Sequence, residues 1–121
     1  MELNDLKEFV ILRGNKNADL NFKVTKTGMS PLLIVAAKGE ADMLGLLLQN
    51  HALDVNMTDN FGVNAFWVAA FHGQIDAMHL LRQRDVEMYS TNQNGSNALH
   101  MAVKKQNYTV MQELLAMKFD V

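Results

Sequence analysis

The sequence predicts an all-α solenoid of about three helix–turn–helix repeats, preceded by a partial repeat at the N-terminus. The first observation is internal repetition: residues 59–73, DNFGVNAFWVAAFHG, have counterparts at 25–39, TKTGMSPLLIVAAKG, and at 92–106, NQNGSNALHMAVKKQ. The glycine at the fourth position of these stretches recurs after 34 and then 33 residues. The second observation is that each copy reads as a turn followed by two apolar segments at helical spacing. Such a period indicates a stack whose units bury their apolar faces only against each other.

Before the first copy, residues 4–13 are predicted to form a helix. Asp5 and Glu8 have the spacing of a capping box. Leu6 and Phe9 fall at helical spacing and contribute to one apolar face. We expect this helix to shield one end of the stack.

The first full copy illustrates the order of elements in all three. Residues 25–29 form a turn in which Gly28 supplies the positive φ that such turns commonly need. Ser30 is a natural N-cap, and Pro31 suits the first helical position because its missing N–H would be unpaired there. An outer helix follows the inner one after a short loop. The predicted helices are 31–38 and 41–50 in the first copy, 65–72 and 76–84 in the second, and 98–105 and 109–117 in the third.

Several positions depart from the repeat pattern. Asp85 and Lys118 stand where a glycine would close the outer helix, and Gln106 stands where a glycine would separate the two helices of the third copy. Either these helix ends are weaker or the residues tolerate a left-handed conformation. Gly45 lies inside a predicted helix and costs roughly 1 kcal/mol relative to alanine.

These features resemble the ankyrin repeat family, whose mark is a turn ending in glycine followed by a T-P-L-H motif. Residues 30–33 read S-P-L-L, and residues 97–100 keep the leucine and the histidine as N-A-L-H. Residues 64–67, N-A-F-W, keep only the size pattern. The resemblance covers about residues 17–121, and three copies in phase make it specific.

The second half of each copy also resembles the family. Leucine runs at 46–48 and 80–81 lie where ankyrin repeats have theirs, and residues 54–56, D-V-N, match the end of the repeat. Residues 18–21, A-D-L-N, match it as well, so the helix before them resembles the second helix of an incomplete repeat. We therefore expect a single domain, residues 1–121, comprising an N-terminal capping helix or partial repeat (1–24), repeat 1 (25–58), repeat 2 (59–91) and a C-terminally incomplete repeat 3 (92–121). The apolar third copy also leads us to expect that the natural chain is longer.

Composition excludes several classes of protein. The 121 residues allow one domain, and the net charge of −2 argues against a dedicated nucleic-acid or phospholipid binder. The lack of cysteine excludes a disulfide scaffold and a cysteine-based zinc site. No apolar run approaches the length of a membrane span, and the first residues lack the features of a secretory signal. We expect an intracellular protein of the cytoplasm, with the nucleus as the alternative, and no membrane insertion.

No catalytic motif emerges, so we do not expect an enzyme, a cofactor or a metal site. His72 and His79 lie on opposite sides of a predicted loop and should not converge on a metal. In the resemblance, His100 occupies the T-P-L-H position, where imidazole bonds between adjacent turns. Trp67 fills the equivalent position without that bond, and we interpret it as packing rather than as a binding platform. Met29 lies at a turn position that the family exposes, whereas Met43, Met78, Met101 and Met111 fall on predicted core faces.

Charge distinguishes the two sets of helices. The predicted inner helices carry Lys38, His72, Lys104 and Lys105 but no Asp or Glu, so stacking would line these residues along one rim. The alternative is that cations simply prefer helix C-termini. Phe61 and Phe71 occupy variable, normally exposed positions of the repeat, as interface hot spots do, although Phe61 could also pack onto its neighbouring turn.

The resemblance implies non-catalytic protein–protein recognition through the concave face of turns and inner helices. The expected partner is an acidic or amphipathic segment of another protein. The alternative is a regulatory or substrate-recruiting domain of a longer enzyme or channel. The oligomeric state is not predicted. The predicted partner-binding residues are Lys26, Thr27, Met29, Lys38, Asn60, Phe61, Val63, Phe71, His72, Gln93, Asn94, Ser96, Lys104 and Lys105.

Overall fold

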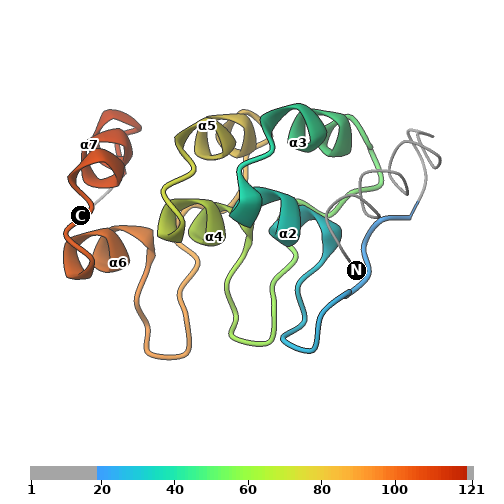
Figure 1. Ribbon diagram of the computed structural model, residues 1–121, viewed down its shortest axis with the longest axis horizontal. Coiled ribbons are helices and arrows are strands. Elements are labelled where there is room, and N and C mark those ends of the chain that lie inside the picture. The colour runs from blue at the N-terminus through green and yellow to red at the C-terminus, as the bar shows by residue number, and fades with distance from the viewer. Residues whose placement is uncertain (1–18, 120–121) are drawn as a thin grey trace.

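The computed structural model describes residues 19–119 and arranges them as a two-layered helical stack. Inner helices form one layer, outer helices form the second, and a hairpin-like turn, here called a finger, precedes each inner helix (Figure 1). No strand occurs between residues 19 and 119. The predicted all-α solenoid is thus confirmed. The helices are α2 (Pro31–Lys38), α3 (Ala41–Leu48), α4 (Ala65–Phe71), α5 (Ile75–Gln83), α6 (Ala98–Lys104) and α7 (Tyr108–Ala116).

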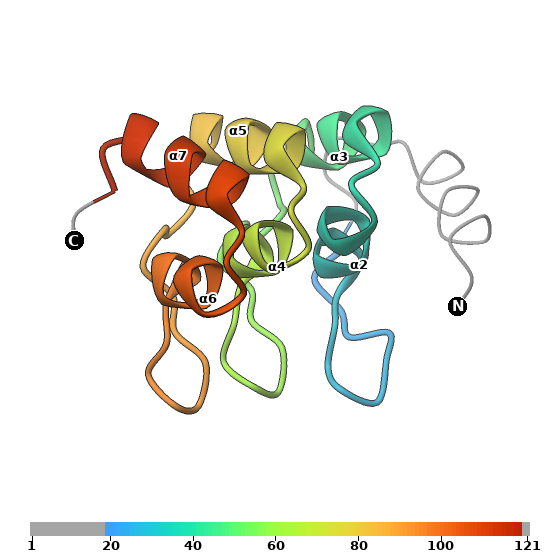
Figure 2. The same ribbon diagram turned by 60° about the vertical axis from the view of Figure 1, so that its left-hand side comes forward.

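Each helix predicted for the three repeats is present, and no boundary differs from the prediction by more than two residues. The inner helices α2, α4 and α6 lie side by side in both views, with α3, α5 and α7 above them (Figure 2). The predicted helix at 4–13 lies outside the described residues.

The inner helices begin at three polar residues that occupy one repeat position, Ser30, Asn64 and Asn97. Their side-chain oxygens accept hydrogen bonds from the backbone N–H three residues later, at 3.4, 3.1 and 2.9 Å. Asn64 is only 1% exposed, and its Nδ2 also donates to the carbonyl of Glu87 at 2.7 Å. The caps therefore fix where the inner helices start. In the second repeat, the cap also ties α4 to the segment that leads into the third finger.

The predicted departures at helix ends are realised as left-handed residues. Gly39 closes α2 with φ 71°, as expected for a C-terminal glycine. Asp85, Gln106 and Lys118 adopt the same region with φ of 56°, 57° and 61°. The chain keeps the geometry of the repeat where it lacks the glycine, at a cost in backbone strain.

The apolar core runs between the two layers, and α4 lies at its centre. α4 packs against α2 on one side, α6 on the other and α5 above. Five of its seven residues are buried, with Phe66 the largest fully buried side chain. Met43 and Met78 are buried as predicted, whereas Met101 and Met111 are only half-buried. α6, in contrast, buries only Ala98 and Ala102 among its seven residues.

Candidate partner-binding groove

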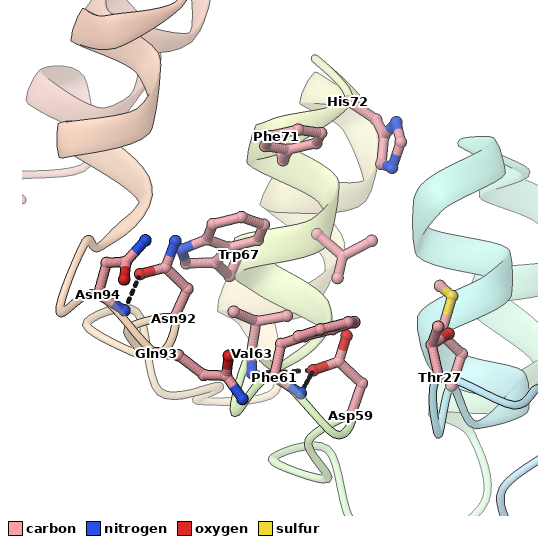
Figure 3. Close-up of a pocket in the computed structure, with 12 residues that line it drawn as sticks. Thr27, Asp59, Phe61, Val63, Trp67, Phe71, His72, Asn92, Gln93 and Asn94 are labelled. Atoms are coloured by element: carbon pink, nitrogen blue, oxygen red, sulfur yellow. Dashed lines mark hydrogen bonds between the residues drawn. The ribbon is translucent and has the colours of Figure 1, made fainter.

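A groove of about 440 Å³ crosses the exposed side of α4 between the fingers (Figure 3). It runs from the finger before α4, where Phe61 lies, to the C-terminal end of the helix, where His72 lies. The lining residues come from all three fingers and from α4: Thr27, Met29, Asp59, Phe61, Val63, Trp67, Val68, Phe71, His72, Asn92, Gln93 and Asn94.

The fingers are held by side-chain bonds to their own backbone. Asp59 Oδ1 accepts from the N–H of Phe61 at 2.8 Å and of Val63 at 3.2 Å, because the turn brings both amides to the carboxylate. Asn92 accepts the equivalent pair in the third finger, and Thr25 Oγ1 accepts one such bond in the first. The finger is thereby fixed from within, and it presents the Phe61 ring with 47% of its surface exposed. The predicted exposure of Phe61 is confirmed.

Asn60 joins the first two fingers. Its backbone N–H donates to the carbonyl of Thr27 at 2.9 Å, and its Nδ2 donates to the carbonyl of Lys26 at 3.1 Å. Its Oδ1 accepts from Lys23 Nζ at 3.2 Å. The Asn60 side chain thus holds the fingers at a fixed spacing, a role that leaves the Lys26 side chain exposed beside it.

Trp67 connects α4 to the third finger. Its Nε1–H donates to the carbonyl of Ser96 at 3.0 Å, and the same carbonyl accepts from the N–H of Asn92. The expectation that Trp67 lacks a bond between adjacent turns is therefore wrong, because indole reaches the next finger through Nε1. His100, at the equivalent position of the third repeat, uses Nδ1 to accept from the N–H of Asn97 within its own repeat.

The ring of Phe71 lies between Trp67 and Lys105. The Trp67 and Phe71 rings stack with centroids 5.1 Å apart and an interplanar angle of 11°. Lys105 Nζ lies 3.9 Å from the Phe71 ring centroid and donates to the Phe71 carbonyl at 2.6 Å. Phe71 is consequently half-buried rather than freely exposed as the sequence suggested.

Two lysines and a histidine, Lys38, Lys105 and His72, occupy one position of the repeat and are here called the cation row. Lys38, His72 and Lys105 follow one another after 34 and 33 residues, and all are exposed at the C-terminal ends of the inner helices. Partial burial lowers the pKa of His72 below its usual value of 6.5, and the charges of Lys105 and Lys38 lower it further. These two charges therefore create a positive potential at the end of α4.

The structure brings eight of the fourteen predicted residues together in the groove: Thr27, Met29, Phe61, Val63, Phe71, His72, Gln93 and Asn94. Val63 is only 3% exposed, so it forms part of the floor. The other six lie outside the lining: Lys26, Lys38, Asn60, Ser96, Lys104 and Lys105. Four lining residues were missed: Asp59, Trp67, Val68 and Asn92. Helical spacing could have identified two, because Trp67 and Val68 lie four and three residues before Phe71.

Outside the groove, a side-chain pair joins two helices of the outer layer. His79 Nε2 and Glu113 Oε2 lie 2.9 Å apart between α5 and α7. Within residues 19–119, no three His, Asp or Glu side chains lie close enough together to hold a metal ion. None of the helices in that range has the length and apolar character needed to span a membrane.

Comparison with known proteins identifies the repeats. A family model described as ankyrin repeats matches in three copies, over residues 2–92 and 52–121. The chain is 27% identical over 110 residues to an ankyrin repeat domain-containing protein, SAT10, of Stachybotrys chartarum. The matched region covers 86% of this chain and 6% of that protein. It is 36% identical over 74 residues to the ankyrin repeat and KH domain-containing protein mask-1 of Caenorhabditis elegans, covering 61% of this chain and 3% of that protein.

A further match is to an L-asparaginase of Dirofilaria immitis, at 34% identity over 83 residues, covering 69% of this chain and 14% of that protein. The chain thus spans only a small fraction of the length of each of these relatives.

Proposed function

Because the chain belongs to the ankyrin repeat family, whose repeats generally serve as protein-interaction modules, we propose that it is a non-catalytic module that binds a segment of a partner protein. The segment would lie along the face made by the fingers and the inner helices. The observation that carries this proposal is the groove over α4, with Phe61 projecting from a finger that its own hydrogen bonds hold in place.

The placement of Phe61 supports a binding role for physical reasons. A large aromatic side chain that is nearly half exposed leaves apolar surface in water, which a partner could bury. The finger is already ordered, so binding need not supply the entropy of fixing that loop. Aromatic residues in such positions are common among the few side chains that dominate interface energies. The remaining predicted residues, including Lys26, Lys38 and Lys104, would surround this anchor as a polar rim.

A comparison of Phe61→Ala with the wild-type protein tests the proposal. Partners captured by the wild type from a lysate of its own cells are identified by mass spectrometry, and one is purified for affinity measurements. We expect Phe61→Ala to weaken that affinity by about 2 kcal/mol, which is about 30-fold. Its melting temperature should fall by less than about 4 °C, because the side chain is on the surface.

Tyr108→Ala is the matched control. Tyr108 is an aromatic residue of α7 that is 66% exposed and does not line the groove. Its removal should leave the affinity unchanged. Equal affinities for the Phe61→Ala and wild-type proteins would contradict the proposal, and so would a melting temperature that falls by the amount typical of a core phenylalanine.

A second function is favoured by the coverage of the relatives. Since the matched region is 3–14% of those proteins, and one of them is named as an enzyme, the repeats could be a regulatory or substrate-recruiting domain of a longer enzyme or channel. The full-length reading frame separates the two possibilities. If it encodes a catalytic or channel domain, activity measured with and without the repeats would decide whether they regulate it.

A further inference from the structure

We propose that the groove receives one large apolar side chain of an extended peptide, and that an acidic residue about two positions away contacts the cation row. This inference rests on the proposed function and specifies the chemistry of the partner. It is carried by three independent properties of the groove, namely its size, the state of its polar groups and the placement of its charges.

The size fits a single anchoring side chain. Pockets that hold drug-sized ligands have volumes of about 300–1,000 Å³, and the volume of 440 Å³ lies in the lower part of that range. Phe61, Trp67, Val68 and Phe71 supply apolar and aromatic surface on its walls. One large side chain with its flanking backbone would fit within such a space.

Three polar atoms of the lining already have partners. Trp67 Nε1–H donates to Ser96 O, and Asp59 Oδ1 and Asn92 Oδ1 each accept from two backbone amides. An apolar side chain could therefore enter without breaking these bonds or leaving their donors unsatisfied. These three atoms offer a polar side chain no further bond, and the apolar surface of Phe61, Trp67 and Phe71 beside them favours an apolar occupant.

Charge sets the direction of the peptide. The carboxylate of Asp59 lies at the finger end of the groove, and His72 lies at the opposite end with Lys38 and Lys105 in the neighbouring repeats (Figure 3). The three inner helices contain no Asp or Glu. An acidic residue of the peptide is thus attracted to the cation row and repelled by Asp59. Lys105 is held in place by Phe71, so its charge is already positioned.

Helix geometry gives the spacing. His72 follows Trp67 by five positions, which is about 7.5 Å along the helix axis at about 1.5 Å per residue. An extended peptide covers this distance in about two residues at about 3.3 Å each. The acid should therefore be two positions from the anchor, on the side of the peptide that points away from Asp59.

The test uses synthetic nine-residue peptides with blocked ends. One carries a single Leu with Glu two residues after it, and a second has the Glu two residues before it, because the chain direction is open. Matched peptides replace Leu by Ala or Glu by Gln. Binding to the intact chain is followed by amide shifts in ¹⁵N NMR spectra and by fluorescence of Trp67, the only tryptophan of the chain.

One of the two peptides should shift the amides of Phe61, Trp67, Phe71 and Asn94. Replacing Leu by Ala should weaken binding about 10-fold or more, as expected for an apolar side chain that loses its burial. Replacing Glu by Gln should weaken it about 2- to 5-fold at low salt, and the difference should shrink at high salt. Phe61→Ala should abolish the shifts, whereas Tyr108→Ala should not.

Several outcomes would overturn the inference. Shifts confined to other surfaces, equal binding of the Leu and Ala peptides, or no binding of either acidic peptide would each do so. Displacement of the peptide by a 20-residue thymidine oligonucleotide at similar concentration would assign the cation row to nucleic acid instead. If the natural partner still requires Phe61 while the peptides fail, the proposed function stands and only this inference falls.

Discussion

His72 lies between two lysines that occupy the same repeat position on either side of it. Its pKa is lowered by partial burial and by the charges of Lys105 and Lys38. As the pH falls, His72 is therefore protonated at a higher pH in the unfolded chain than in the folded one. The stability that His72 contributes is therefore complete above pH 6.5, the usual pKa of this side chain, and is lost as the pH falls through its folded-state pKa. We expect the difference in unfolding free energy between the wild type and His72→Gln to become less favourable to the wild type as the pH decreases from 7.5 to 5.

Urea unfolding at the two pH values measures this difference. Lys38→Met should reduce the pH dependence, because it removes one of the charges that disfavour protonation of His72. An identical pH dependence in the wild type and in His72→Gln would mean that the histidine is not in the environment described.

Gly62 tests the geometry of the finger that carries Phe61. Its φ is 84°, and an added Cβ would meet only the carbonyl oxygen of Thr91 at 3.5 Å, which is an ordinary contact. Gly62→Val should therefore destabilise through backbone strain, by about 1–3 kcal/mol in urea unfolding.

Gly45 provides a comparison of opposite sign. It lies inside α3, and an added Cβ would meet nothing within 4 Å. Gly45→Ala should raise the unfolding free energy by about 1 kcal/mol. A neutral Gly62→Val beside a stabilising Gly45→Ala would show that the turn can relax.

At the scale of the elements, left-handed helix ends without glycine are the main local conflict between sequence and fold. Gln106 follows α6 with φ 57° and is exposed. Gln106→Gly should stabilise the protein by up to about 1 kcal/mol, because glycine adopts this conformation without a steric penalty. The same change at Gln112, which is exposed in the middle of α7, should instead cost about 1 kcal/mol. Thermal unfolding of the two variants gives the comparison, and a destabilised Gln106→Gly would refute the interpretation.

Helix positions could be predicted because their signals are local. Each inner helix starts after a finger glycine and an N-cap, namely Ser30, Asn64 or Asn97, and the period repeats those signals. The exposure of Phe61 followed from its position in the turn. Each of these features depends only on residues that are close together in the chain, so a single sequence is enough to predict it.

The contacts made across repeats could not be predicted in the same way. The bond from Trp67 to the Ser96 carbonyl and the position of Lys105 over Phe71 depend on how far one repeat is turned against the next. That rotation depends on how the core packs, and Phe66 is fully buried there. Sequence analysis therefore singled out the aromatic residues, but it predicted only a packing role for Trp67 and more exposure for Phe71 than the structure has.

At the scale of the whole molecule, the groove and the cation row exist only because three repeats are stacked. The groove takes residues from all three fingers, and the cation row takes one residue from the C-terminal end of each inner helix, at its last residue or its C-cap. No single repeat contains either. A change that loosens the interface between repeats would therefore alter the candidate site without touching a lining residue.

The enclosure of α4 also bears on how the chain folds. A single repeat cannot bury its apolar face, so the first stable nucleus must be a pair of adjacent repeats. α4 belongs to both available pairs of the three described repeats, whereas α6 belongs to one. Folding through either pair of repeats therefore requires α4, whereas only folding through the second and third repeats requires α6.

Ala69 and Ala102 make this testable, since they occupy one repeat position, 33 residues apart, and both are buried. Replacing either by glycine should cost about 1 kcal/mol or more. In stopped-flow measurements, Ala69→Gly should mainly slow folding, with a φ-value above about 0.5, and Ala102→Gly should mainly accelerate unfolding, with a value below about 0.3. The opposite order would place the nucleus at the third repeat. If the expected order is found, α4, the helix that supports the groove, is among the first elements to form and the last to unfold.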